Sequence, residues 1–257
     1  MNSDLIIIIL VSFGASMLTF FSGFGLGTIL APVFMFFFEP ILAIAMTAIV
    51  HFLNNLFKLS LLFKSIDFKI ALKFGLPAMI GSFAGSILLF SISTIVITRY
   101  HLGEVELQLE LLKLLVAALL IFFALLEIIP FIKINVTDKH LPLGGILSGF
   151  FGGLTGHQGA LRSLFMMKLG LKKEVFIATG VFIACMIDIT RLGVYGEKMT
   201  GFNLEENFPY ILSATLAAFA GAFIGNKLLK KVTMQSLQIM VAIMIIIFSF
   251  ALALGII

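Results

Sequence analysis

Residues 23–32 read GFGLGTILAP and interrupt an apolar run that extends from Asp4 to Phe38. Glycine weakens a helix by roughly 1 kcal/mol and proline by roughly 3 kcal/mol relative to alanine. Three glycines and a closing proline therefore predict a break in this run. In lipid, broken backbone is tolerated only where other protein buries it or where it lines a polar cavity. The break indicates a site inside the protein.

The composition of the chain is that of a polytopic membrane protein. Of its 257 residues, 61% are hydrophobic and 12% are charged, and the mean hydropathy is +1.19. Soluble domains have about 45–50% apolar and about 25% charged residues. The net charge of +4 comes from lysines beside the apolar segments, which is typical of topology signals rather than of nucleic-acid binding. The single cysteine, Cys185, lies within an apolar run, so an internal disulfide is excluded.

Apolar runs separated by charged or Pro- and Gly-rich breaks predict eight segments of membrane length. The segments are 4–38, 41–63, 70–98, 109–132, 141–168, 174–195, 208–229 and 234–257. The first segment of each half is interrupted by glycine, and the second contains a threonine (Thr47 or Thr179) followed by a polar pair at i, i+3. We therefore predict two membrane repeats of four segments, at 1–132 and 133–257.

Charge and length predict that the two repeats are inverted. Lys and Arg divide equally between the two sides if every segment crosses once, but most gather on one side if 141–168 dips in and returns. The run 4–38 is too long for one span of about 20 residues and too short for two. Two re-entrant segments would give the halves opposite orientations, with a substrate site where the broken helices meet. The predicted fold is an all-α integral membrane protein with a glycine-broken helix pair in each half.

The two breaks are predicted to bind an anion, because a broken helix frees backbone N–H groups at an N-terminus that carries about half a positive charge. Arg162 adds a permanent charge and a planar fork suited to sulfonate, sulfite or carboxylate oxygens. The alternative for Arg162 is a snorkelling side chain near an interface. His157 is a proton carrier, a neutral donor or merely hydrogen-bonded. The predicted substrate-binding residues are Gly25, Leu26, Gly27, Thr28, Gly156, His157, Gln158, Gly159 and Arg162.

A second polar group lies on segments 41–63 and 174–195, whose polar residues we expect to face each other across the repeat. Asp188 and Arg191 can meet on one helix face. They form either an internal ion pair that neutralises both or a proton-linked gate in which protonated Asp188 releases Arg191. The predicted gating or coupling residues are His51, Asn54, Asn55, Lys58, Asp188 and Arg191. In contrast, we interpret the Gly-xxx-Gly pair Gly81 and Gly85 as close packing between helices.

No feature of the sequence indicates catalysis. The four histidines (His51, His101, His140 and His157) are isolated and have no Cys or carboxylate cluster at metal-ligand spacing. Residues 152–156 lack the Lys-Ser/Thr ending and the preceding strand that a phosphate-binding loop needs. We therefore predict no enzyme activity, no metal and no cofactor.

The chain resembles the sulfite exporter TauE/SafE family, also called the TSUP transporters, over nearly its whole length. That family carries a Gly-x-Gly-Gly-Gly-x-x-x-x-Pro type motif early in each half, then a helix with a threonine and polar residues, then a basic loop. Residues 23–32 match the motif with Leu26 in place of one glycine, 45–47 match the threonine of the helix, and 58–64 match the basic loop. The second motif, 156–163, lacks the glycine triplet and the proline, so the two half-sites differ chemically.

The resemblance implies passive or ion-coupled movement of small sulfur-containing anions, such as sulfite, thiosulfate or sulfonates, across the bacterial inner membrane. We therefore predict a secondary transporter, a multi-pass protein of the inner membrane, that moves a small anion by alternating access. A proton or another cation is the candidate coupling ion. The alternatives are an anion channel, which needs a continuous polar path, and a membrane assembly factor that does not transport.

Overall fold

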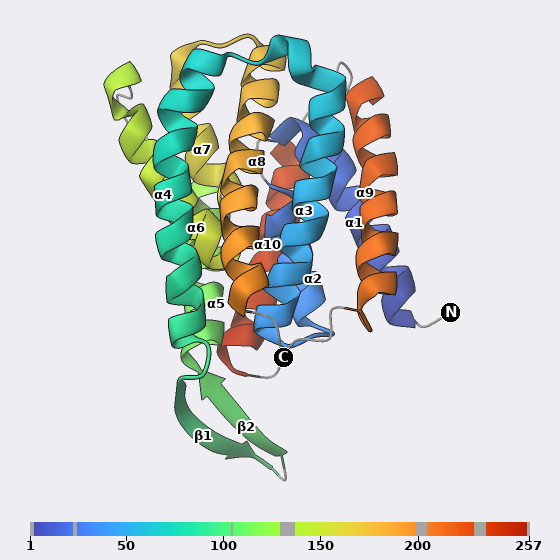
Figure 1. The fold of residues 1–257 in the computed structure, drawn as a ribbon. Helices are drawn as coiled ribbons and strands as arrows, with labels where there is room; N and C mark the ends of the chain where they lie inside the picture. Colours follow the sequence, from blue (N-terminus) through green and yellow to red (C-terminus); the bar gives the residue numbers. More distant parts are fainter. Residues whose placement is uncertain are drawn as a thin grey trace.

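The computed structural model describes residues 3–22, 25–103, 105–128, 137–198, 205–228 and 235–255. These residues form ten α-helices, three short 3-10 helices and one β-hairpin (Figure 1). The α-helices are α1 (Ser3–Ser22), α2 (Leu26–Met35), α3 (Pro40–Leu62), α4 (Phe68–Ile92), α5 (Leu111–Ile128), α6 (Leu141–Thr155), α7 (Gly159–Met166), α8 (Lys173–Lys198), α9 (Phe208–Leu228) and α10 (Gln235–Ala253). The other elements are η1 (Phe63–Ser65), η2 (Asp138–His140), η3 (Met167–Leu169), β1 (Val96–Leu102) and β2 (Val105–Glu110).

The described part of the chain is built as a membrane protein. Four stretches, which include α3, α4, α8 and α9, are long and apolar enough to cross a membrane. Their outer faces carry large apolar side chains; Ile80 on α4 is 70% exposed and Leu216 on α9 is 57% exposed. Polar side chains such as Asn54 and Asp188 are buried in the interior instead. This arrangement suits lipid outside and polar contacts inside, and the prediction of a helical membrane protein is confirmed.

Both predicted helix breaks are present. The segment 4–38 forms α1 and α2, and residues 23 and 24 of its motif lie outside the described residues. The segment 141–168 forms α6 and α7, which are separated at Gly156 in the left-handed conformation (φ +87) that glycine adopts without a steric cost. Pro32, predicted to close the first break, lies inside α2 instead, where its missing N–H removes only one helical hydrogen bond.

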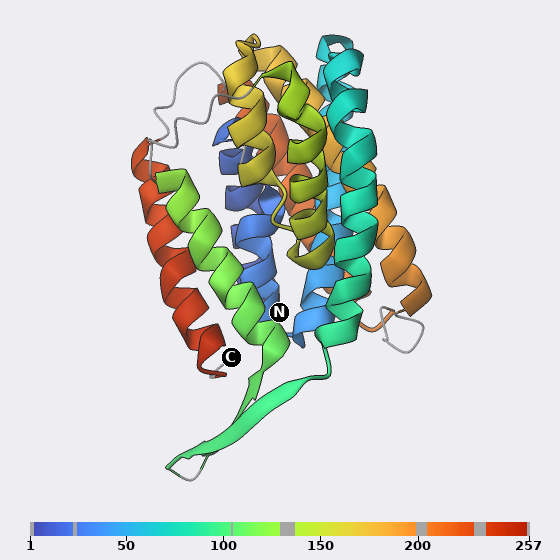
Figure 2. The same ribbon diagram turned by 90° about the vertical axis from the view of Figure 1, so that its left-hand side faces the viewer.

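The short helices of the two broken pairs, α2 and α7, lie toward opposite ends of the bundle. Figure 1 shows α2 toward the end that carries the β-hairpin and α7 toward the other end. Between them, α3 and α8 pack against each other, so that both breaks lie beside this central pair. The helices α5 and α10 pack side by side at one edge of the bundle (Figure 2). The first and last described residues lie at the hairpin end.

The β-hairpin corrects the predicted limits of segments 70–98 and 109–132. The helix α4 ends at Ile92, and the chain then forms β1 and β2 with Arg99 opposite Gln108 and Leu102 opposite Val105. β-branched residues fill Val96–Thr98 at the start of β1, and such residues favour strands. Apolar content alone does not distinguish a short strand from the end of a helix. The hairpin projects from the bundle (Figure 2).

Glycines allow two helix pairs to approach closely. A Cβ added at Gly81 or Gly85 on α4 would collide with the carbonyl oxygen of Ile146 or Phe150 on α6. A Cβ added at Gly221 on α9 would likewise collide with a carbonyl oxygen of α1. The interpretation of Gly81 and Gly85 as packing residues is confirmed, because small residues let helix backbones touch in a membrane.

This packing predicts different outcomes for two glycine substitutions in helices. In Gly149→Ala, the added methyl would collide with the carbonyl oxygen of Ala78, so we expect a loss of about 1–3 kcal/mol in stability. In Gly193→Ala, the added methyl meets nothing within 4 Å, so we expect a gain of up to about 1 kcal/mol. Thermal unfolding of the purified proteins in detergent measures both. Equal shifts would contradict the close packing of α4 on α6.

Candidate functional site

The two helix breaks meet in the interior. A Cβ built on Gly27, in the first turn of α2, would lie 3.4 Å from the carbonyl oxygen of Gly156 and 3.6 Å from Cγ2 of Thr47 on α3. A Cβ built on Gly25, the N-cap of α2, would lie 3.2 Å from Nε2 of His51. The turns of both broken pairs therefore contact each other and the central helix α3.

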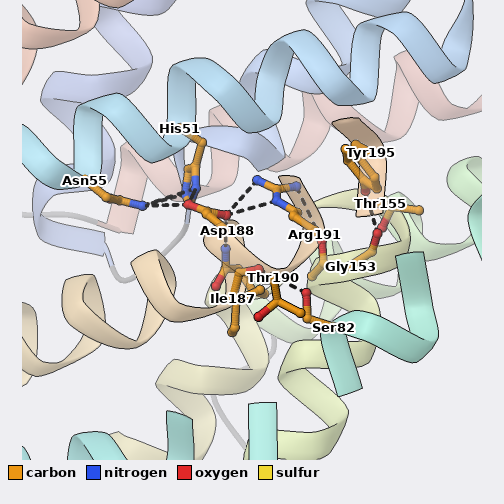
Figure 3. Close-up of polar contacts among 12 residues, drawn as sticks. His51, Asn55, Ser82, Gly153, Thr155, Ile187, Asp188, Thr190, Arg191 and Tyr195 are labelled. Carbon is orange, nitrogen blue, oxygen red and sulfur yellow. Dashed lines mark hydrogen bonds and ion pairs between the residues drawn. The ribbon is translucent and has the colours of Figure 1, made fainter. Parts of the chain in front are cut away.

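Asp188 is the polar centre of this region (Figure 3). Its carboxylate is fully buried on α8 and accepts hydrogen bonds from α3, from the second break and from α8 itself. From α3, Nδ1 of His51 lies 2.7 Å from Oδ2, and Nδ2 of Asn55 donates to Oδ2 at 3.4 Å. From the second break, Nε2 of Gln158 donates to Oδ1 at 3.0 Å. On α8 itself, Nε of Arg191 donates to Oδ1 at 3.0 Å.

The guanidinium of Arg191 contacts Asp188 and a backbone carbonyl inside the protein. Its Nη2 lies 2.8 Å from Oδ1 of Asp188, an ion-pair contact without hydrogen-bond geometry. Its Nη1 donates to the carbonyl oxygen of Gly152 at 3.4 Å, and the hydroxyl of Tyr195 donates to that of Gly153 (Figure 3). These carbonyls belong to the C-terminal turn of α6, which carries partial negative charge. Arg191 therefore binds the C-terminal turn of α6 as well as Asp188. The predicted ion pair between Asp188 and Arg191 is confirmed.

A cavity lies beside Asp188 and is lined by α1, the N-terminus of α2, α3, α7 and α8. Two buried cations face it, Lys58 from α3 and Arg162 from α7. Nη1 of Arg162 donates to Oε1 of Gln158 at 3.3 Å. Across the cavity, Gly180 makes room for the guanidinium, since a Cβ there would lie 3.2 Å from Nε of Arg162. No Asp or Glu is among the described residues of the lining.

The structure brings some of the predicted binding residues to this cavity and leaves others behind it. The residues of the two predicted sets that line the cavity are Gly25, Leu26, His51, Asn55, Lys58 and Arg162. Others are buried without lining it: Asp188 and Arg191 in the interior of α8, and, at the two breaks, Gly27, Thr28, Gly156, His157, Gln158 and Gly159. Some of the predicted residues therefore line the cavity, and others lie behind those lining residues.

Two predicted residues have other surroundings. Nδ1 of His157 lies 2.8 Å from Oγ1 of Thr155, and its ring stacks on Phe123 of α5 with centroids 5.8 Å apart. Asn54 does not face Asp188, because its Oδ1 accepts a hydrogen bond from Ser16 on α1 at 3.1 Å. These side chains point away from the cavity into contacts with α5, α6 and α1.

Sequence reasoning missed several residues of the lining, including Thr19 on α1, Met166 on α7, and Phe176 and Gly180 on α8. Thr19 is 5% exposed, and its hydroxyl has no hydrogen-bond partner among the described residues. A hydroxyl inside an apolar helix is a weak signal, because such groups commonly bond to their own helix. In the described residues no group of three His, Cys, Asp or Glu side chains could hold a metal ion.

The comparison with known families agrees with this architecture. Residues 8–252 match the family model described as Sulfite exporter TauE/SafE. The chain belongs to the sulfite exporter TauE/SafE family. A comparison with curated proteins found no match. The matched residues of the family model, 8–252, include both helix breaks. Membership in this family implies membrane transport rather than enzymatic catalysis as the general function.

The contacts of Asp188 predict how substitutions will affect stability. In Asp188→Leu, Arg191 and His51 lose their carboxylate, so we expect a loss of about 3–5 kcal/mol, as for other buried ion pairs broken on one side. The double variant Asp188→Leu/Arg191→Met removes both charges and is expected to recover part of that loss. Thermal unfolding in detergent compares the two. A double variant no more stable than the single one would contradict this account of the ion pair.

Proposed function

We propose that the protein is a secondary transporter that binds a small sulfur-containing anion, such as sulfite, thiosulfate or a sulfonate, in the cavity beside Asp188. The observation that carries this proposal is the charge of the lining: the buried side chains of Lys58 and Arg162 face one cavity, and its described lining includes no carboxylate. Buried like charges repel strongly in a medium of low dielectric constant. An anion between them would relieve that repulsion.

The geometry of the lining suits an oxyanion. The planar guanidinium of Arg162 can offer parallel N–H donors to two oxygens. The N-terminus of α2 adds backbone N–H groups around Gly25 and Leu26, with no side-chain cap at Gly25. Asp188, beside the cavity, already accepts bonds from His51, Gln158 and Arg191. A bound oxyanion would add a negative charge next to Arg162.

Alternating access is the mechanism that we propose for this site. The cavity is bounded by α1, α2 and α3 from the first half and by α7 and α8 from the second, so movement of one half against the other would open it to either side. Inverted repeats are supported by reciprocal packing, since α4 of the first half packs on α6 and α9 of the second half packs on α1. The contacts of His51 and Asn55 on α3 with Asp188 on α8 would couple the halves.

A substitution of Arg162 tests the anion site. In Arg162→Ala, loss of charge-assisted hydrogen bonds worth roughly 1.5–3 kcal/mol should weaken anion binding about 10- to 100-fold. We expect sulfite flux into proteoliposomes to fall accordingly, while the protein still inserts. Arg99→Ala on the exposed β-hairpin is the matched control and should keep its flux. Unchanged flux in Arg162→Ala would contradict the proposed site, and flux that does not saturate with sulfite would favour a channel.

Cysteine labelling tests the inverted repeats. The only native cysteine, Cys185, is buried and can be replaced by alanine. In that background, Ser3→Cys and Leu254→Cys should react with an impermeant reagent from the same side, because both ends of the described chain lie at the hairpin end (Figure 1). Lys64→Cys in η1 should react from the other side. Termini that react from opposite sides would contradict an odd number of crossings in each half.

A further inference from the structure

His51 connects the buried carboxylate to the cavity. The side chain is 2% exposed, and its Nδ1 lies 2.7 Å from Oδ2 of Asp188. A carboxylate only accepts, so Nδ1 carries the hydrogen and donates it. The other ring nitrogen, Nε2, lies toward Gly25 at the edge of the cavity, where a Cβ would come within 3.2 Å of it. In the neutral ring this nitrogen holds a lone pair.

We propose that His51 binds a proton at Nε2 when the anion enters the cavity, so that the protein moves anion and proton together. This inference rests on the proposed anion site and adds the identity of the coupling ion and its binding residue. The sequence places the proton-linked step at Asp188. That carboxylate accepts from His51, Asn55, Gln158 and Arg191, and adding a proton to it would disrupt those contacts. A proton on Nε2 leaves every bond to Asp188 in place.

The charges around the imidazole favour this linkage. Asp188 and Arg191 face it from α8, Arg162 lies across the cavity on α7, and Lys58 lies on its own helix, α3. The described parts of α1 and α2 at the cavity contribute no titratable side chain. The three cations oppose a further positive charge while the cavity is empty, and only one carboxylate, Asp188, favours it. An anion between Lys58 and Arg162 would remove that opposition, and by reciprocity a proton on His51 would strengthen anion binding.

The amide of Asn55 lies beside both ring nitrogens. Its Nδ2 lies 3.1 Å from Nδ1 and 3.4 Å from Nε2 of His51, and it also donates to Oδ2 of Asp188 at 3.4 Å. A proton on Nε2 faces Gly25 and the edge of the cavity rather than Asp188, so the amide can keep its bond to the carboxylate. In the proposed step a proton from water bonds to the Nε2 lone pair, giving imidazolium, and no bond to the anion forms. The proton returns to water on the other side when the anion leaves.

Proton uptake on anion binding tests the proposal. Purified protein in a weakly buffered detergent solution with a pH indicator is titrated with thiosulfate or with methanesulfonate, which do not themselves exchange protons between about pH 5 and pH 8, where histidine titrates. Binding is measured in parallel by calorimetry. The wild type should take up protons on binding, up to one per bound anion. His51→Gln should still bind, with lower affinity, and take up none.

A matched variant and a spectroscopic signal separate the alternatives. His140→Gln changes an exposed histidine of η2 and should leave proton uptake unchanged. In the wild type, NMR of labelled histidine should show one buried imidazole becoming protonated on addition of thiosulfate or methanesulfonate, which tests the proposal even if His51→Gln does not fold. Binding without proton uptake, uptake that persists in His51→Gln, or uptake lost in His157→Gln instead would overturn the assignment to His51. Failure of both anions to bind the wild type would overturn the anion site itself.

Discussion

The fully buried carboxylate of Asp188 is the constraint on which the interior depends. A charge taken out of water is costly unless other groups replace its hydration. Here the replacement comes from α3 through His51 and Asn55, from the second break through Gln158, and from α8 through Arg191. Each donor loses its partner if its element moves away. One side chain therefore holds a central helix and a broken turn of the backbone in a single arrangement.

The same contacts divide the cations of the interior into two kinds. Arg191 bonds to Asp188 and to the end of α6, so its charge is balanced within the protein. Lys58 and Arg162 face the cavity. On α8 a carboxylate precedes the cation at i, i+3, whereas on α3 the amide Asn55 precedes Lys58. The described lining of the cavity contains Lys58 and Arg162 and no Asp or Glu.

Close glycine packing gives these polar contacts a rigid frame. Gly149 of α6 lies against the carbonyl of Ala78 on α4, and Gly153 lies against that of Ser82. The same Gly153 carbonyl accepts hydrogen bonds from Ser86 on α4, at 3.3 Å, and from Tyr195 on α8. The end of α6, and with it the second break, is thus placed by α4 and α8 together. Both broken pairs are held by a helix of the other half, since α9 packs on α1 in the same way.

The sequence by itself determined the membrane class and the positions of both helix breaks, because hydropathy and the helix-breaking effect of glycine act locally, and it named some of the polar residues that line the cavity. It also placed the Asp188–Arg191 pair, whose spacing follows from the helix turn. Only the tertiary structure decided that His51 meets a carboxylate 137 positions away, and that Asn54 turns to α1. The β-hairpin at 96–110 and the position of Thr19 in the cavity lining were likewise not predictable from the sequence. Which face of a helix contacts which distant neighbour depends on tertiary packing, and a local sequence pattern does not predict these contacts.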